Sequence, residues 1–267
     1  MLGAIIGDIA GSRYERYNIK TKEFPFFSIW DSMTDDSMMT LAVADALLSA
    51  RKDHTDLGKQ AIASMQKLGR MFPDCGFGGH FYQWIGTDNP APYGSWGNGA
   101  AMRVSPCGWM GESIREVKLL SKAVTEVSHN HPQGLKGAEA VATAVFLART
   151  GYDKKEIRDY IEANYYALYF TLDQIRDSYT FDVNCQGSVP QAIEAFLEGR
   201  DFEDPIRNAI SIGGDSDTIA AIAGGIAEAY YGIPQTLRTQ ALTYFEDSDL
   251  QTILERFEMA YPPKITK

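Results

Sequence analysis

Helical periodicity is the feature of this sequence that most restricts its fold. Five segments are rich in Ala, Leu and Glu, which favour helices, and their apolar residues recur at intervals of three and four. These segments are 36–51, 134–150, 154–170, 189–199 and 217–232. The period-two alternation of strands is scarce, and no Asn-Gly turn lies between two strand-like runs. The sequence therefore predicts an all-α protein.

Two of these segments, 36–50 and 217–231, are apolar on nearly every side. Helices of this kind lie at the centre of a bundle, not on its surface. Gly224 and Gly225 fall in the middle of the second, where each costs roughly 1 kcal/mol relative to Ala. We expect close approach of another helix or a ligand to offset that cost. Gly151, Gly199 and Gly232 are predicted to end helices in left-handed conformations.

The region 72–110 is predicted to be one long irregular loop, because it is dense in Gly, Pro and aromatic residues. A loop this long in a compact domain is usually functional or disordered, and its aromatic residues argue against disorder. We find no linker, low-complexity run or repeat of solenoid period. The sequence therefore predicts a single domain over residues 1–267.

Composition and charge exclude several classes of protein. The chain has 267 residues and a net charge of −10, which argues against a broad nucleic-acid surface built from Lys and Arg. Its three cysteines have neither zinc-ligand spacing nor the pattern of a disulfide framework. Asp8 interrupts the apolar N-terminal run, and the run 219–233 is too short and too charged to span a bilayer. We expect a cytoplasmic monomer that does not enter membranes.

Acidic residues stand at the start of both apolar segments. Thr34, Asp35 and Asp36 precede one, and Asp215, Asp217 and Thr218 precede the other. Helix capping explains part of this pattern, since Asp and Thr are preferred caps and acids are stabilised in the first turn. Capping needs one oxygen acceptor, however, and not two carboxylates and a hydroxyl at each of two buried helix starts.

If both helices are central, their N-termini can converge and bring four carboxylates together. Such groups repel one another, and a hard divalent cation removes the repulsion. Oxygen ligands without His or Cys favour Mg²⁺, Mn²⁺ or Ca²⁺ over Zn²⁺. Four carboxylates are enough to share between two ions. The two clusters together therefore predict a metal site.

A phosphatase with an aspartate nucleophile is the competing interpretation of "DSDTI" at 215–219. That motif should follow a buried strand of a parallel α/β sheet. Here it follows "SIGG", and only about fifty residues remain, too few to build the sheet after its first strand. We therefore disfavour it.

Five motifs, in order and spacing, resemble the ADP-ribosylglycohydrolases over most of the chain. They are "GAIIGDIAGSRYE" (3–15), "TDDS" (34–37), "GNGAAMRVSP" (97–106), "SHNHPQGLKGA" (128–138) and "GGDSDTIAAIAGGIAEAYYG" (213–232). The last is the most specific. The resemblance implies a single compact orthogonal bundle of helices, and an enzyme that cleaves the N- or O-glycosidic bond between ADP-ribose and an acceptor.

The resemblance also implies two Mg²⁺ or Mn²⁺ ions and a set of site residues. The implied metal ligands are Thr34, Asp35, Asp36, Asp215, Asp217 and Thr218, and Asp35 and Asp36 are expected to serve catalysis as well. Glu15 occupies the position of an acid with a catalytic role in some members. The expected substrate-binding residues are Gly97, Asn98, Gly99, Ala100, Met102 and His129; a Ser, not the usual Thr, precedes His129.

Several alternatives remain open at the level of sequence. Asp8 either faces the metals or bonds to backbone amides, and Arg103 pairs either with phosphate or with an acid. Backbone N–H groups of the Gly-rich loop 94–101 can bind a diphosphate, or the loop is an ordinary one. His129 is either a pocket residue or a satisfied loop histidine. A module that binds ADP-ribose without turnover, or a hydrolase of another ribosyl compound such as O-acetyl-ADP-ribose, is the alternative function.

Overall fold

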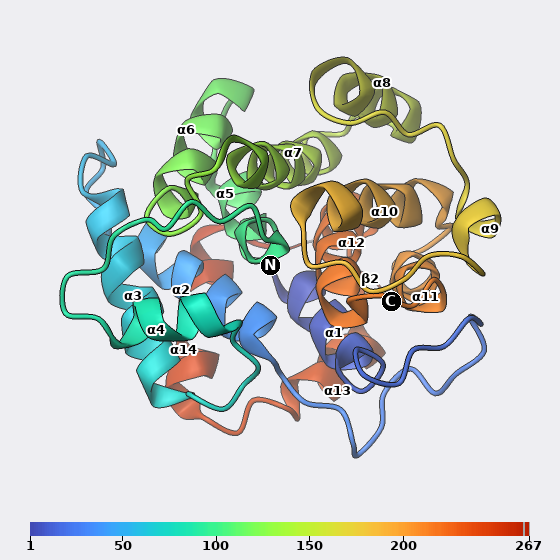
Figure 1. The fold of residues 1–267 in the computed structure, drawn as a ribbon, viewed down its shortest axis with the longest axis horizontal. Helices are drawn as coiled ribbons and strands as arrows, with labels where there is room; N and C mark the ends of the chain where they lie inside the picture. Colours follow the sequence, from blue (N-terminus) through green and yellow to red (C-terminus); the bar gives the residue numbers. More distant parts are fainter. Residues whose placement is uncertain (264, 267) are drawn as a thin grey trace.

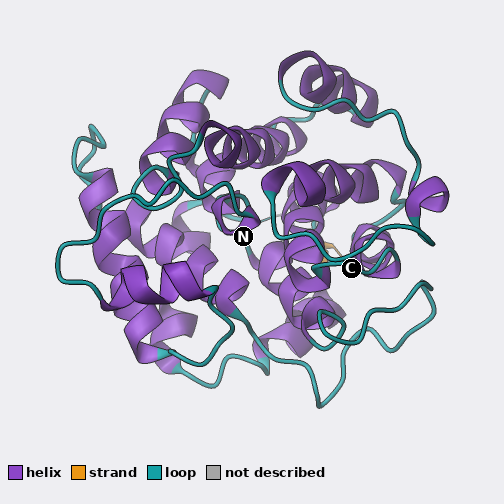
Figure 2. Ribbon diagram, viewed as in Figure 1, coloured by secondary structure: helices purple, strands orange, loops and turns teal. Residues whose placement is uncertain are grey.

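The computed structural model describes residues 1–263 and 265–266, and it consists mainly of helices (Figures 1 and 2). The only strands in this part of the chain are β1 (Ile233–Pro234) and β2 (Ile265–Thr266), which pair in parallel. Residues 264 and 267 of the predicted domain lie outside the described residues. The helices are α1 (Leu2–Ser12), α2 (Asp35–Ser49), α3 (Leu57–Met71), α4 (Gly79–Gly86), the 3₁₀ turn η1 (Asn98–Ala100), α5 (Ser105–Met110), α6 (Ile114–Thr125), α7 (Pro132–Arg149), α8 (Lys154–Asn164), α9 (Leu172–Ile175), α10 (Cys185–Glu198), α11 (Glu203–Ser211), α12 (Ser216–Tyr231), α13 (Gln235–Leu242) and α14 (Ser248–Ala260).

The all-α prediction is confirmed, and each of the five predicted segments contains a helix. They correspond to α2, α7, α8, α10 and α12. The prediction for 154–170 is too long, because α8 ends at Asn164 and residues 165–170 are not helical. Tyr165 and Tyr166 turn their side chains into the core there, each 8% exposed.

The region 72–110 is not one loop, and that prediction is wrong. It contains α4, η1 and α5. In α4 the apolar residues Phe81, Trp84 and Ile85 fall on one buried face, and the Trp84 indole donates to the Val127 carbonyl at 3.1 Å. The short apolar pattern is thus amphipathic, although flanking glycines conceal it.

Helices α1 and α12 lie together at the centre of the molecule (Figure 1). Every residue of α12 from Ser216 to Ala229 is buried, as predicted for a central helix. A Cβ added to Gly224 would lie 2.2 Å from the Gly3 carbonyl oxygen, so close helix–helix approach accounts for this glycine. Among the described residues, no helix is long and apolar enough to cross a membrane.

The predicted helix-ending glycines divide into two groups. Gly151 and Gly232 adopt positive φ, +92° and +79°, as expected. Gly199 does not: its φ is −69°, and the residue is extended. A Cβ there would lie 2.4 Å from the Pro205 ring, so close packing, not a left-handed turn, requires glycine at this position.

Candidate metal centre and substrate cavity

The N-termini of α2 and α12 meet, as the two acidic clusters predict. Carboxylate oxygens of Asp8, Asp36 and Asp217 all lie within 4.8 Å of one another. The Thr218 hydroxyl donates to Asp36 Oδ2 at 3.1 Å and joins the two helix starts directly. Asp8 comes from α1, so three central helices contribute carboxylates to one buried cluster.

The two helix starts use their polar residues differently. The Thr34 hydroxyl accepts from the Asp36 amide at 3.3 Å and caps α2. At α12 the N-cap is Asp215, but its side chain makes no capping hydrogen bond. One hydroxyl therefore meets the capping requirement at α2, and capping does not explain the carboxylates.

Asp8 bonds to backbone amides, one of its two expected roles. It accepts from the Thr34 amide at 2.9 Å, the Thr34 hydroxyl at 2.7 Å and the Ser37 amide at 3.1 Å. The Ser37 hydroxyl donates to it as well. Asp8 thus fixes the start of α2 while also belonging to the carboxylate cluster.

Two glycines shape the turn that carries Asp215 into the site. Gly213 and Gly214 have φ of +68° and +79°, a conformation in which a side chain is strained. Asn18 clamps the turn, since its Oδ1 accepts from the Gly214 amide at 2.7 Å and its Nδ2 donates to the Gly214 carbonyl at 2.9 Å. Asn98 then orients Asp215, donating from Nδ2 to Asp215 Oδ2 at 2.6 Å.

The carboxylates of the cluster are strongly perturbed. Burial, and after it the negative charge of Asp217, raises the pKa of Asp36 well above its usual range. Burial and Asp215 do the same to the pKa of Asp217. Burial is also the largest cause that raises the pKa of Asp35 to about 7 and that of Asp8 to about 6. The cluster by itself therefore favours protons or another source of positive charge.

The residues present fit a hard divalent cation. Asp36 Oδ1 is buried and finds no hydrogen-bond partner among the described residues, so one strong acceptor is left unsatisfied there. Among the ion pairs of the described residues, none involves a carboxylate of this cluster, so no Lys or Arg neutralises it there. All the candidate metal-ligand atoms are oxygens of Asp and Thr, the set that suits Mg²⁺ or Mn²⁺.

A cavity of about 370 Å³ opens on this cluster. Phe81 and Tyr93 form part of its wall, together with Phe181 and Val183, and the sequence pattern indicated neither of the last two. Two predicted site residues, Thr34 and Ala100, are not among its lining residues: Thr34 hydrogen-bonds to Asp8, and Ala100 is fully buried within η1. The predicted residues that line the cavity are Glu15, Asp35, Asp36, Gly97, Asn98, Gly99, Met102, His129, Asp215, Asp217 and Thr218.

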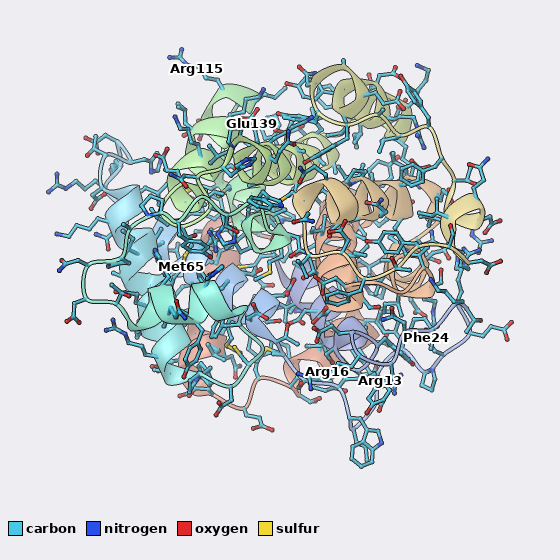
Figure 3. All side chains as sticks on the ribbon, in the orientation of Figure 1. Arg13, Arg16, Phe24, Met65, Arg115 and Glu139 are labelled. Atoms are coloured by element: carbon cyan, nitrogen blue, oxygen red, sulfur yellow. The ribbon has the colours of Figure 1, made fainter. Side chains whose placement is uncertain are left out.

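Glu15 lies at the cavity on the segment that follows α1. Asn18 donates to the Glu15 carbonyl at 3.0 Å, so the residue that clamps the Gly214 turn also holds this segment. Burial, and next the nearby Asp215, raises the pKa of Glu15, while Arg16 lowers it in part. Arg13 and Arg16, on either side of Glu15 in the chain, lie below α1 in the view of Figure 3.

The Gly-rich loop uses most of its backbone N–H groups internally. The amides of Gly94, Gly97, Asn98, Ala100 and Ala101 all donate to protein oxygens. The loop is therefore ordered, but it is not the open array of donors that a diphosphate site was expected to need. Arg103 is wholly buried at the cavity and forms none of the ion pairs of the described residues, so pairing with an acid, one of its two expected roles, is not found.

Functional positions missed by the sequence analysis are those that act across long distances in the chain. Asn18 and Ser37 orient the cluster, and neither was singled out. Ser37 stands in "TDDS", so the motif could have indicated its contact with the cluster. The sequence around Asn18 contains no pattern that predicts a hydrogen bond to Gly214.

Comparisons with known proteins identify the family of the chain. The family model described as ADP-ribosylglycohydrolase matches residues 1–264. The ADP-ribosylhydrolase ARH3 of Gallus gallus is 28% identical, and the match covers 76% of this chain and 71% of that protein. The human ADP-ribosylhydrolase ARH3 is 25% identical, covering 94% of this chain and 90% of that protein. The ADP-ribosylarginine hydrolase Tri1 of Pseudomonas putida is 27% identical, covering 87% of this chain and 70% of that protein.

A solved structure supports the fold. A chain of an "ADP-ribosylglycohydrolase-related protein complex" superposes with a TM-score of 0.71 at 24% identity, covering 97% of this chain and 96% of that chain. The family model spans nearly the whole sequence, and the solved fold covers nearly all of both chains. The protein belongs to the ADP-ribosylglycohydrolase family.

Proposed function

We propose that the protein is a metal-dependent hydrolase that cleaves the glycosidic bond between ADP-ribose and an acceptor, thereby reversing ADP-ribosylation. The observation that carries this proposal is the convergence of the carboxylates on one cavity, where Asp36 Oδ1 is buried and has no hydrogen-bond partner among residues 1–263 and 265–266. Family membership and the names of the relatives support it. Cytoplasmic location, a monomeric state and a single domain stay predictions. The three cysteines, Cys75, Cys107 and Cys185, are free thiols.

The proposed metal ligands are Thr34, Asp35, Asp36, Asp215, Asp217 and Thr218, shared between two Mg²⁺ or Mn²⁺ ions. Asp8 is a further candidate because its oxygens lie with those of Asp36 and Asp217. When bound, such ions orient substrate hydroxyls and lower the pKa of a bound water.

The side chains of this chain would supply the remaining chemistry. Cleavage of a glycosidic bond places positive charge on the sugar ring, which nearby carboxylates stabilise. The raised pKa of Glu15 makes its carboxyl suited to hold a proton and deliver it to the leaving group. The same carboxylate can then accept a proton from the attacking water.

The cavity supports ADP-ribose as the portion that the protein recognises. Met102 and Phe81 offer apolar surface in the cavity, and Asn98 offers an ordered amide. The acidic cluster lies in the wall of the same cavity. The acceptor is left open by this arrangement. The relative Tri1 is named for ADP-ribosylarginine, so an arginine-linked acceptor is the first candidate to assay.

A turnover panel tests the proposal. Arginine- and serine-linked ADP-ribosyl peptides, an ADP-ribosylated base and O-acetyl-ADP-ribose would be incubated with the protein in Mg²⁺, Mn²⁺ or EDTA. We expect release of ADP-ribose from at least one substrate, and its loss in EDTA. Absence of release from every substrate, together with calorimetric binding of ADP-ribose, would establish a binding module instead.

A further inference from the structure

Arg103 is a buried cation without a carboxylate partner. Its side chain is 0% exposed, and it belongs to none of the ion pairs of the described residues. Its guanidinium carbon lies 5.4 Å from the centre of the Phe81 ring, and its Nη2 donates to the Ser128 hydroxyl at 2.8 Å. Its Nε has no hydrogen-bond partner in the part of the chain that the structure describes. A buried charge is expensive unless it is hydrogen-bonded or serves a ligand.

The Ser128 hydroxyl connects this cation to His129. Ser128 Oγ lies 2.8 Å from His129 Nδ1 as well as 2.8 Å from Arg103 Nη2. A guanidinium only donates, so Ser128 accepts from Arg103 and keeps its own hydrogen for another acceptor. The described residues offer this hydrogen one partner, His129 Nδ1. Nδ1 is then an acceptor, and the proton of the neutral ring lies on Nε2.

The ring of His129 is neutral and held in place. Burial, and after it the charge of Arg103, lowers the pKa of His129 well below its usual value. The ring packs at 5.5 Å from Tyr93 and 6.0 Å from Phe81, measured between ring centres. A neutral, immobilised imidazole offers one donor in a fixed direction.

Nε2 points to the Gly-rich loop at the cavity. A Cβ added to Gly99 would lie 3.3 Å from Nε2, and one added to Gly97 would lie 3.7 Å from it. These glycines line the cavity together with His129. Most N–H groups of the loop donate within the protein and are not free to bind a ligand. The Nε2–H group of His129 can therefore supply the hydrogen-bond donor that the loop backbone does not offer.

We propose that Arg103, acting through the Ser128 hydroxyl, holds His129 in the Nε2–H tautomer, and that this N–H donates to an anionic phosphate oxygen of the substrate. Arg103 and Ser128 are positioning residues, and His129 is the residue that touches the ligand. The identity of the ligand rests on the proposed function, whereas the tautomer does not. The chain of donors runs from Arg103 to Ser128 to His129 and ends at the phosphate.

The tautomer can be measured directly by NMR. Long-range ¹H–¹⁵N correlations of the imidazole ring, assigned by comparison with His129→Gln, distinguish a protonated Nε2 from a protonated Nδ1. We expect protonated Nε2 in the wild type and in Ser128→Thr, which keeps the hydroxyl, and a mixture in Ser128→Ala. A wild-type ring protonated on Nδ1 overturns the inference, whatever the enzyme does in turnover assays.

The affinity for ADP-ribose tests whether the Nε2–H group of His129 contacts the ligand, which the NMR measurement does not test. By calorimetry with ADP-ribose, we expect Ser128→Ala and His129→Asn to bind about ten-fold more weakly or worse, the loss typical of a hydrogen bond to a charged oxygen. His129→Gln, whose amide nitrogen reaches the position of Nε2, should recover part of the affinity. Thermal unfolding of each variant checks that it is folded.

The outcomes distinguish this inference from the proposed function. Unchanged affinity in His129→Asn with an intact fold contradicts the phosphate contact, even if the wild type hydrolyses its substrate. If the wild type binds no ADP-ribose, the proposed function and the phosphate contact both fail, while the NMR result still decides the tautomer.

Discussion

Asn98 shows how one side chain links the Gly-rich loop to the acidic cluster. Its amide nitrogen donates both to Asp215 Oδ2 at 2.6 Å and to the Ser188 hydroxyl at 3.0 Å. Asn98 is 6% exposed, so these bonds form away from bulk water. Groups that orient a metal-ligating carboxylate contribute strongly to affinity, and we infer that Asn98 has this role toward Asp215.

Asn98→Ala is therefore expected to weaken Mg²⁺ or Mn²⁺ binding by roughly 10- to 100-fold, the range found for outer groups of metal sites. Titration calorimetry measures the change. Ser188→Ala is the matched control, since it removes the other partner of the same amide and leaves the bond to Asp215. Equal metal affinity in Asn98→Ala and Ser188→Ala would contradict the role assigned to Asn98.

The carboxylates could be predicted from the sequence, and the support that lies farthest from them in the chain, Asn18, could not. Asp35, Asp36, Asp215 and Asp217 stand in two repeated local patterns, and both patterns mark helix starts. Asn18 acts on Gly214, far along the chain, and no local pattern encodes that contact. Family resemblance indicated Glu15, but not what holds it.

At the scale of elements, the packing of α1 on α12 forms the floor of the site. Gly3, Gly7 and Gly11 recur every four residues on α1 and face α12. A Cβ on Gly7 would lie 2.0 Å from the Ala220 carbonyl oxygen, and one on Gly11 would lie 2.6 Å from Asp217 Cα. The glycines thus let α1 approach closely enough to bring Asp8 into the cluster.

Gly7→Ala should destabilise the fold by roughly 1–3 kcal/mol or more, the cost of overpacking against backbone that cannot move aside. Gly86→Ala in α4 is the control, because a Cβ there meets nothing within 4 Å. Urea unfolding gives both free energies. A Gly7→Ala protein as stable as the wild type would show that the helices are not in tight contact.

The same packing explains why α1 was not predicted as a helix. Three glycines and a buried aspartate disfavour an isolated helix, and the compensation comes only from α12, which lies far away in sequence. Glycines likewise concealed α4, whereas the Ala-rich segments of α2, α7 and α12 carry their own helical signal. Local pattern thus identified five helices, but it missed others that local propensity also supports, such as α6 and α14, which are rich in Leu and charged helix formers.

For the whole molecule, the buried carboxylates connect stability to pH and to metal. Their folded pKa values lie above the unfolded ones: about 6 for Asp8, about 7 for Asp35, and well above the usual value for Asp36 and Asp217. The folded state therefore binds more protons than the unfolded state above about pH 4. The contribution of these groups is greatest at low pH and is lost as pH rises through the folded values.

The metal-free protein should accordingly show a lower Tm at pH 8 than at pH 6.5. This window avoids most of the opposing effect of His129, whose lowered pKa adds stability as pH rises to its usual value of 6.5. Differential scanning calorimetry measures the shift. Saturating Mg²⁺ should raise Tm more at pH 8, because protons no longer compete for the ligands.

Asp36→Asn serves as the control for that pH dependence, since it removes one of the buried charges. Its metal-free Tm should fall less between pH 6.5 and 8 than that of the wild type. A wild-type Tm that falls no more over this window than the Tm of Asp36→Asn would contradict the placement of the carboxylates in one buried cluster.

The central claim is that the cluster acts as a metal centre in hydrolysis, and the rate of ADP-ribose release by Asp217→Asn in saturating Mg²⁺ tests it most directly. We predict a loss on the order of 100-fold or more relative to the wild type, as when a group that stabilises transition-state charge is removed. Glu126→Gln, a change of an exposed acid beyond the C-terminal end of α6, should leave the rate unchanged. Full activity in a folded Asp217→Asn protein would contradict the account.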